Sequence, residues 1–255
     1  MRYHHGPLAG GDQALELAVA HALVRRASGG DLDEVIRVYR PSAPVAVFGR
    51  REVRLDGFPA AVRAARAAGF EPAVRATGGR AVAYTGQALV VDHVARDLDA
   101  AGGLDHRFDG FGRRLAQAFR GLGVDARVGA VPGEYCPGAH SVNARGTVKL
   151  VGTAQRVVKD AWLFSSLVVV GDESRIRPLL TDVYGHLGEE FDGASVGSLS
   201  AEIPALDLDT VEAAIRAVYG LGDLVPAPLD DATLDLADEL VTRHRADDVG
   251  SGTRS

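Results

Sequence analysis

The only cysteine in the chain, Cys136, lies in a loop and not in an apolar run. Residues 131–138 around it contain glycine and proline turn formers, and a thiol in such a loop can be exposed and reactive. Lys149 follows thirteen residues later in an expected strand over residues 147–151, where alternation places it opposite its apolar neighbours. An ammonium near a thiol favours the thiolate and can donate to a developing oxyanion. The pair therefore predicts nucleophilic chemistry at a carbonyl carbon.

Two other interpretations of Cys136 stay open on these residues alone. His140, four residues further on, offers a Cys/His pair in place of the cysteine–lysine pair. Alternatively, Cys136 is a passive loop residue. Lys149 and Lys159 are the only lysines, and the other 26 of the 28 basic residues are arginines. A lysine that persists against this bias indicates a need for its compact ammonium, unless it has persisted by chance.

The elements that must position these residues mix helices and strands without strict alternation. This order favours an α+β fold with mixed, largely antiparallel sheets over a doubly wound parallel sheet. A strand over residues 162–170 is apolar on both faces, which predicts a central place in a sheet. Periodicity and turn residues predict helices over residues 12–27, 58–68, 108–122, 174–186, 210–219 and 231–244, and strands over residues 35–39, 45–48, 73–75, 81–83, 89–91, 147–151 and 154–158.

Length and charge exclude several classes of protein. The 255 residues are 46% hydrophobic, which is enough for a sizeable core in one large domain or two small ones. The formal net charge of −6 argues against nucleic-acid binding, which usually needs a basic face. No apolar run approaches the roughly 20 residues of a membrane helix, and no secretory signal is visible, so no membrane association and a cytoplasmic location are expected. A single cysteine excludes an internal disulfide.

Several catalytic motifs are absent from the sequence. It contains no phosphate-binding loop, no dinucleotide-binding glycine motif and no His-Glu-x-x-His motif, so neither a cofactor nor a metal is expected. Residues 193–197 match the Gly-x-Ser-x-Gly pattern of serine hydrolases, but an acidic segment precedes them and Pro204 follows soon after. That pattern needs an apolar strand before it and a helix directly after it. We therefore expect a loop that leads to a helix cap.

Two short segments resemble the signatures of one known superfamily. Residues 75–82 resemble the Arg-x-x-Gly-Gly-x-Ala-Val signature of the lipoate/biotin protein ligase and octanoyltransferase superfamily, and residues 149–156 resemble its Lys-x-x-Gly-x-x-Gln-Arg signature. The loop over residues 134–138, Glu-Tyr-Cys-Pro-Gly, is most similar to the cysteine-dependent octanoyl/lipoyl amidotransferase branch. The resemblance spans residues 12–170, and the order of the paired motifs makes it specific.

The resemblance implies transfer of octanoyl or lipoyl groups between lysines of lipoyl-domain proteins, through a cysteine thioester and without ATP. Cys136 would be the nucleophile, and Lys149 would polarise the acyl carbonyl and carry a proton. The implied partners are glycine cleavage H protein or the E2 subunits of 2-oxoacid dehydrogenases. The residues implied to bind substrate are Arg75, Gly78, Gly79, Gly152 and Gln155.

The substrate-binding assignments have structural alternatives. Gly78 and Gly79 either let the backbone approach a substrate closely or form a tight turn between strands. Arg75 either orients this loop or is one surface arginine among many. Gln155 either bonds the region of the acyl carbonyl or satisfies a strand edge.

The sequence departs from the ATP-dependent lipoate ligases at two positions. Arg80 stands where many of them have a third glycine, and Tyr84 stands near their usual histidine. The chain also lacks room for the full accessory domain of the large ligases. These differences favour the cysteine transferase. The alternatives are an ATP-dependent lipoate-protein ligase that forms a lipoyl-adenylate at Lys149, and a non-catalytic protein that binds lipoyl domains.

The expected organisation is one lipoate/biotin ligase-like acyltransferase domain with a helical C-terminal segment. The domain covers residues 1–222, a C-terminal helix packs on it over residues 223–246, and a mobile tail covers residues 247–255. The acyl chain length, the donor and acceptor, and the oligomeric state stay open at this stage.

Overall fold

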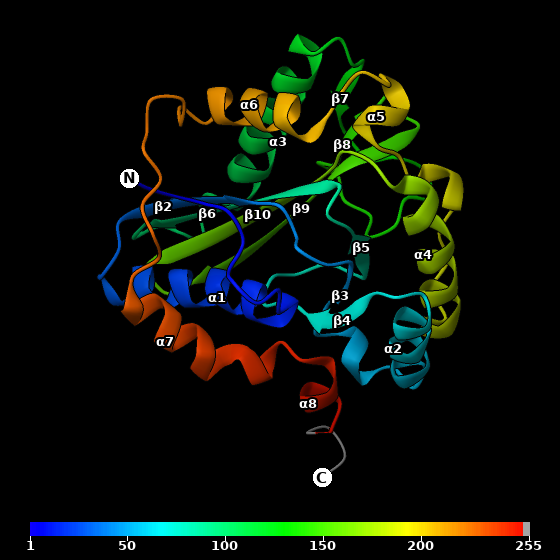
Figure 1. Ribbon diagram of the computed structural model, residues 1–255, viewed down its shortest axis with the longest axis horizontal. Helices are drawn as coiled ribbons and strands as arrows, with labels where there is room; N and C mark the ends of the chain where they lie inside the picture. The colour runs from blue at the N-terminus through cyan, green and yellow to red at the C-terminus, as the bar shows by residue number, and fades with distance from the viewer. Residues whose placement is uncertain (252–255) are drawn as a thin grey trace.

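The computed structural model describes residues 1–251, and two β-sheets form its framework (Figure 1). The larger sheet has seven strands in the order β1-β2-β6-β10-β9-β8-β7, and the smaller has three in the order β4-β3-β5. Neighbouring strands are antiparallel except in the pairs β1–β2 and β3–β4. The expected α+β fold with mixed, largely antiparallel sheets is confirmed. The strands are β1 Arg2–His5, β2 Glu34–Tyr39, β3 Val45–Phe48, β4 Glu71–Val74, β5 Val82–Tyr84, β6 Ala88–Arg96, β7 Ala126–Val128, β8 Val142–Ala144, β9 Val148–Val158 and β10 Ala161–Val169.

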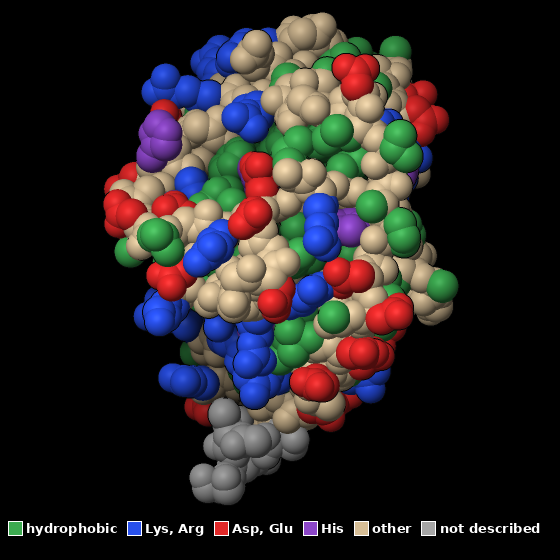
Figure 2. Space-filling view, turned by 90° about the vertical axis from the view of Figure 1, so that its left-hand side faces the viewer, with side chains coloured by type: hydrophobic (Ala, Val, Ile, Leu, Met, Phe, Trp, Pro, Cys, Tyr) green, Lys and Arg blue, Asp and Glu red, His purple; other side chains and the backbone are tan. Residues whose placement is uncertain are grey.

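Helices cover both faces of the large sheet (Figure 1). α3 and α6 lie on one face, and α1 and α7 lie on the other, where the small sheet with α2 and α4 completes the layer. None of the helices within residues 1–251 is both long and apolar enough to cross a lipid bilayer. On the face of the molecule drawn in Figure 2, acidic, basic and hydrophobic side chains are interspersed. The helices are α1 Gln13–Gly29, α2 Phe58–Ala67, α3 Leu104–Gly121, α4 Glu173–Leu187, α5 Leu199–Glu202, α6 Leu208–Val218, α7 Asp231–Leu240 and α8 Ala246–Ser251.

The central strand of the large sheet is β10, as its apolar pattern predicts. It pairs with β6 on one side and with β9 on the other, and nearly all of its residues are buried. β9 is one continuous strand, so the expectation of two strands there was wrong. Glycine often interrupts a strand, but here Gly152 and Thr153 pair with Leu167 and Ser166 of β10. Pairing with β10 continues on both sides of Gly152, so β9 is not interrupted there.

Other differences concern short elements. The strands β1, β7 and β8 were not expected, because three or four residues are too few to show a period of two. The helix expected over residues 231–244 ends at Leu240 and continues as a 3-10 turn, Val241–Arg243. Residues 246–251, expected within a mobile tail, form α8, and the rest of that tail, residues 252–255, lies outside the described residues.

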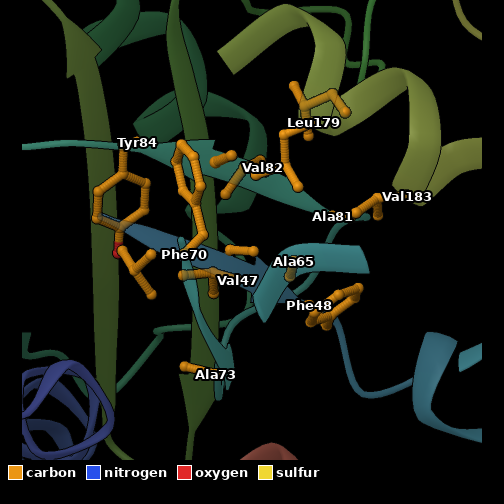
Figure 3. Packing of buried hydrophobic residues seen from close by; sticks show 14 of the residues in the cluster. Val47, Phe48, Ala65, Phe70, Ala73, Ala81, Val82, Tyr84, Leu179 and Val183 are labelled. Atoms are coloured by element: carbon orange, nitrogen blue, oxygen red, sulfur yellow. The ribbon is translucent and has the colours of Figure 1, made fainter. Parts of the chain in front are cut away.

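The small sheet packs against α4 through aliphatic side chains. Leu179 and Val183 of α4 face Ala81 and Val82 at the start of β5 (Figure 3). All four side chains are buried. Burial of each such aliphatic group stabilises the fold by about 1–3 kcal/mol. This contact fixes β5, and therefore fixes the end of the Gly78–Gly79 loop that precedes it.

The C-terminal segment supports the other end of that loop. His244 Nδ1 donates to the carbonyl of Val74 at 2.8 Å, and the Val74 N–H donates to the carbonyl of His244 at 2.8 Å. His244 Nε2 accepts from Nδ1 of His21 in α1 at 3.1 Å. Burial lowers the pKa of His21 to about 3 and that of His244 to about 4, so both rings are neutral at neutral pH. Val74 ends β4, and Arg75 follows it directly.

Candidate active site

Cys136 lies in the loop between β7 and β8 with its backbone in the left-handed region, at φ +44°. This conformation is uncommon for a residue with a Cβ atom and persists only where neighbours fix it. The Cys136 N–H donates to the Tyr184 hydroxyl at 2.7 Å, and that hydroxyl donates to the carbonyl of Ala81 at 3.0 Å. Tyr184 of α4 therefore ties the cysteine loop to the loop that precedes β5.

Two donors surround the Cys136 sulfur. The Arg80 N–H lies 3.1 Å from Sγ, and Nη2 of Arg75 lies 3.6 Å from it. Arg75 is only 8% exposed, and its guanidinium also donates to the carbonyls of Gly78 and Arg80. Arg75 thus orients the glycine loop and also brings a cation to the thiol, so it is not a surface arginine. Both groups can donate hydrogen bonds to negative charge that develops on the sulfur.

Gly79 makes this arrangement possible. Its φ is +102°, and an added Cβ atom would lie 2.8 Å from the Cys136 sulfur and 2.5 Å from Arg75 Nη2. A side chain at this position would have to displace the sulfur or the guanidinium, at a backbone angle that suits glycine. The neighbouring Gly78 N–H donates to the carbonyl of Gln155 in β9 at 3.4 Å, so the glycine loop bridges the small sheet and the large one.

The buried carboxylate of Glu52 fixes the Gly78–Gly79 loop on the side of β3 and β5. Glu52 accepts from the N–H groups of Gly49 and Ala81, each at 2.7 Å. Burial raises the pKa of Glu52. An added Cβ atom on Gly49 would lie 2.0 Å from the carbonyl oxygen of Gly79, so this position also requires glycine. Glu52 and Gly49 thus fix the position of the Gly78–Gly79 loop relative to Cys136.

Lys149 is 2% exposed, and its ammonium lies below the cysteine loop. Nζ donates to the carbonyls of Tyr135 at 3.0 Å and Cys136 at 2.7 Å, and it lies 2.9 Å from Oε2 of Glu134. These contacts use the three donors of an ammonium. Glu134 is also buried and accepts from the Ser141 hydroxyl at 2.7 Å. Lys149 therefore holds the backbone of Cys136, whereas the cation at its sulfur is Arg75.

The remaining residues singled out in the sequence lie around this centre. Gly152 lies in β9, where an added Cβ atom would be 3.7 Å from Cε of Lys149. The side chain of Gln155 is directed to the start of α3, where it donates to the carbonyl of Leu104 at 2.9 Å and accepts from Arg107 at 3.1 Å. His140 stacks on Phe108, with the ring centroids 5.6 Å apart.

Cys136 separates two cavities. The first is an apolar cavity between the large sheet, the small sheet and α1. Its residues include Leu17, Ala20, Val47, Val82, Tyr84, Val90, Asp92, Ala154, Leu163, Ser165 and Leu167, together with Arg75, Cys136 and Gly152. We call it the apolar cavity. The packing around Val47, Val82 and Tyr84 on its small-sheet side is visible in Figure 3.

The second cavity lies on the other side of the glycine loop and is more polar. It is lined by Gly78, Gly79, Cys136, His140, Lys149 and Gln155, with Leu104 and Phe108 of α3 beside them. We call it the open cavity. Cys136, Thr153 and Ala154 border both cavities, so a group bonded to the sulfur could reach into either one.

Among residues 1–251, one acidic residue lines the apolar cavity in addition to the basic Arg75. Asp92 of β6 is 3% exposed, and burial raises its pKa to about 6. Its Oδ1 accepts from the Ser165 hydroxyl of β10 at 2.5 Å. Sequence reasoning did not find Asp92, because an acidic residue within a strand usually marks a solvent face. Tyr184, Glu52 and Glu134 were also missed, since only their contacts across the fold reveal their roles.

With this geometry established, comparison with known proteins identifies the class. The lipoyl protein ligase A/B catalytic domain family matches residues 12–219, and the chain belongs to this family. The superfamily suggested by the two sequence signatures is therefore confirmed.

Solved structures share the fold. Lipoate-protein ligase A bound with ATP superposes with a TM-score of 0.71 at 21% identity, covering 94% of each chain. A bipartite lipoate protein ligase from Thermoplasma acidophilum, studied with its E2 lipoyl domain, gives a TM-score of 0.70 at 20% identity and covers 94% of this chain and 92% of its own. At these identities the likeness concerns the fold alone.

A curated relative points to one branch of the family. An octanoyl-[GcvH]:protein N-octanoyltransferase from Exiguobacterium sp. is 28% identical over 113 residues. The aligned part is 44% of this chain and 40% of that relative, so less than half of the relative is matched.

Proposed function

We propose that this protein transfers an octanoyl or lipoyl group to a lysine of a lipoyl-domain protein through a thioester on Cys136. The observation that carries the proposal is the position of the Cys136 sulfur between the two cavities, with the Arg75 guanidinium and the Arg80 N–H donating to it. The similarity to an octanoyltransferase whose name includes GcvH supports the acyl group and the class of partner.

In the first half of the reaction, the Cys136 thiolate attacks the carbonyl carbon of the donor's acyl-lysine amide. A C–S bond forms, the C–N bond breaks, and the donor lysine leaves as an amine that takes up the proton first held by the thiol. The acyl chain then occupies the apolar cavity, where about 25 cal/mol is gained for each Å² of its apolar surface removed from water.

Lys149 acts on the carbonyl oxygen. Lys149 borders the open cavity, and its Nζ donates to the carbonyl of Cys136 at 2.7 Å, next to the site of attack. By exchanging this backbone acceptor for the developing oxyanion, Lys149 stabilises the tetrahedral intermediate. Loss of such a donor typically costs about 2.7–4 kcal/mol in the activation free energy.

In the second half, the acceptor lysine arrives through the open cavity. Its amine attacks the thioester carbon, the C–N bond forms, and Cys136 leaves as a thiolate stabilised by Arg75 and Arg80. The attacking amine loses a proton, which returns to the Cys136 sulfur and regenerates the thiol. Because one amide is broken and another is formed, the overall exchange between two lysines consumes no ATP. A lipoyl-domain protein such as glycine cleavage H protein or an E2 subunit supplies this lysine.

The experiment that tests the proposal is intact-mass spectrometry after incubation with chemically octanoylated H protein. The enzyme should gain one octanoyl group on Cys136, and hydroxylamine should remove it. Transfer should proceed without ATP and Mg²⁺. An unchanged enzyme mass during turnover, or equal turnover by Cys136→Ser, overturns the proposal.

The two alternatives give different outcomes in the same assay. An ATP-dependent ligase would use free octanoate or lipoate only with ATP, and it would release pyrophosphate. A non-catalytic protein would bind the acylated carrier and transfer nothing. Measurement of pyrophosphate release and of carrier binding alongside the mass therefore separates the three functions.

A further inference from the structure

A row of three residues crosses the floor of the apolar cavity. Ala154 of β9 pairs with Ser165 of β10, and Ser165 pairs with Asp92 of β6. Paired residues in neighbouring strands point to the same face of a sheet. All three line the apolar cavity, so the row is a path across its floor.

This path has the length of a short acyl chain. Neighbouring strands lie about 4.7–4.9 Å apart, so Asp92 lies about 10 Å from Ala154. Ala154 and Cys136 border both cavities, which places the start of the path beside the sulfur. An extended eight-carbon chain bonded to Cys136 therefore ends near Asp92.

Asp92 has an unused acceptor at that end. Oδ1 accepts from Ser165, whereas Oδ2 has no hydrogen-bond partner within residues 1–251. The next residue in the row is Arg37, whose ion-pair partner is the buried Glu16. Tyr84 lines the same cavity, and burial and then the charge of Asp92 raise the pKa of its phenol. Asp92 is thus a nearly buried carboxylate that forms no ion pair with any residue in the described range 1–251.

We infer that the apolar cavity, besides admitting an octanoyl chain, prefers a medium-chain acyl group with a hydroxyl or thiol donor at its far end, and that Oδ2 of Asp92 accepts this donor. The inference rests on the proposed function only in placing the acyl carbonyl at Cys136. A plain methyl end would cover the carboxylate without giving it a hydrogen-bond donor, which is costly. A site built to bond a donor discriminates strongly against an analogue that lacks it.

The test compares two acyl chains that differ by one hydroxyl. The probes are the N-acetylcysteamine thioesters of octanoic acid and 8-hydroxyoctanoic acid, and the readout is the rate at which Cys136 gains each acyl mass. The hydroxylated probe should acylate the wild-type enzyme about tenfold to a hundredfold faster, as a hydrogen bond to a charged acceptor allows. Equal rates, or faster reaction of the octanoyl probe, would overturn the inference.

Variants of the row assign the preference to Asp92. Asp92→Leu should abolish or invert it, and the conservative Asp92→Asn should reduce it severalfold because the acceptor loses its charge. Asp182→Asn in α4 is the matched control, because it makes the same change of side chain at an exposed position that borders neither cavity. It should leave the rate ratio unchanged. An unchanged ratio in both Asp92 variants contradicts the inference, and Asp92→Asn decides alone if Asp92→Leu does not fold.

A binding measurement separates this inference from the proposed function. Calorimetry with the Cys136→Ala protein compares octanoate with 8-hydroxyoctanoate and needs no acyl transfer. Tighter binding of the hydroxy acid, lost in the Cys136→Ala/Asp92→Leu protein, supports the inference even if no thioester ever forms. Acylation of wild-type Cys136 without any preference supports the proposed function and overturns the inference.

Discussion

The Cys136 loop and the far end of the apolar cavity bury polar groups in different ways. Below the loop, the Lys149 ammonium contacts Glu134 and the carbonyls of Tyr135 and Cys136, so the buried charges compensate one another. At the cavity end, Asp92 has one hydrogen bond and a free acceptor. Buried polar groups are normally satisfied. The difference teaches that the saturated ammonium holds the cysteine loop in the resting protein and must exchange an acceptor to meet a substrate, whereas the unsaturated carboxylate facing a cavity can accept a ligand directly.

The largest effect should come from the atom that the saturated region positions. Cys136→Ala should lower acyl transfer by roughly 10⁴-fold or more, because no second nucleophile replaces the thiol. The melting temperature should change little, since the side chain is only partly buried. Transfer assays with octanoylated H protein and a thermal melt check this. Turnover within tenfold of wild type would remove Cys136 from the reaction and direct attention to Lys149 as an adenylate-binding residue.

Lys149 should be next in size, with effects on both stability and rate. Lys149→Met leaves the buried carboxylate of Glu134 unpaired, which should reduce the free energy of unfolding by about 3–5 kcal/mol. Turnover of the folded fraction should fall roughly 10²–10³-fold with the loss of the oxyanion donor. Urea unfolding and steady-state rates measure the two effects.

The conservative change sharpens this prediction. Lys149→Arg should be nearly as damaging to turnover, because a planar guanidinium cannot meet the same three acceptors from one atom. Lys159→Arg is the control, since that side chain is exposed. Near wild-type turnover in folded Lys149→Arg would show that a positive charge alone suffices, and would favour His140 as the partner of Cys136.

Gly79→Ala tests the geometry at the sulfur. The new methyl group would lie within 2.8 Å of the Cys136 sulfur, at a backbone angle that suits glycine. Turnover should fall about 10–100-fold through displacement of Arg75 or the thiol. Stability should fall by about 1–3 kcal/mol. Gly121→Ala in α3, where an added Cβ meets nothing within 4 Å, should affect neither. Unaltered turnover in Gly79→Ala would mean that the loop is not held against the sulfur.

Asp92→Asn should give the smallest effect, and it should be stabilising. Burial raises the pKa of Asp92 from 3.8 to about 6, so the folded protein binds more protons than the unfolded chain between these values, and stability falls as the pH rises through that range. Removing the charge should therefore add about 1–3 kcal/mol to the free energy of unfolding at pH 7. The gain should vanish below pH 4. A loss of stability at pH 7 would mean that Asp92 is as well compensated as Glu134.

Sequence patterns predicted the parts of the site that short segments encode. The motifs over residues 75–82 and 149–156 located the glycine loop, Arg75 and Lys149, and the class of fold followed from the order of elements. The parts that patterns missed depend on distant contacts. Tyr184 meets Cys136 across 48 positions, and His244 meets Val74 across 170. Neither spacing has a period that a sequence could display.

Competition from other buried groups explains why Lys149 does not contact the Cys136 sulfur. Lys149 was expected to reach the sulfur, because a strand pattern gives the face of a side chain and not its partner. Glu134 and the loop carbonyls compete for the same ammonium, and they take its three donors. No pattern in the sequence marks Asp92, since only the fold reveals that the small sheet and α1 cover its face of the large sheet.

The contact between His244 and β4 also determines when, during synthesis of the chain, the region around Arg75 can fold completely. A ribosome releases the N-terminal part of a chain first, and that part begins to fold before synthesis ends. β4 is an edge strand of the small sheet, and its outer partner arrives only with residues 244 and 245. Until residues 244 and 245 are synthesised, β4 is paired only with β3, and the Arg75 that follows β4 is fixed from that side alone. The nascent chain therefore carries Cys136 before the neighbouring cation is fixed, so under the proposed function the enzyme becomes reactive only as one of the last events of biosynthesis.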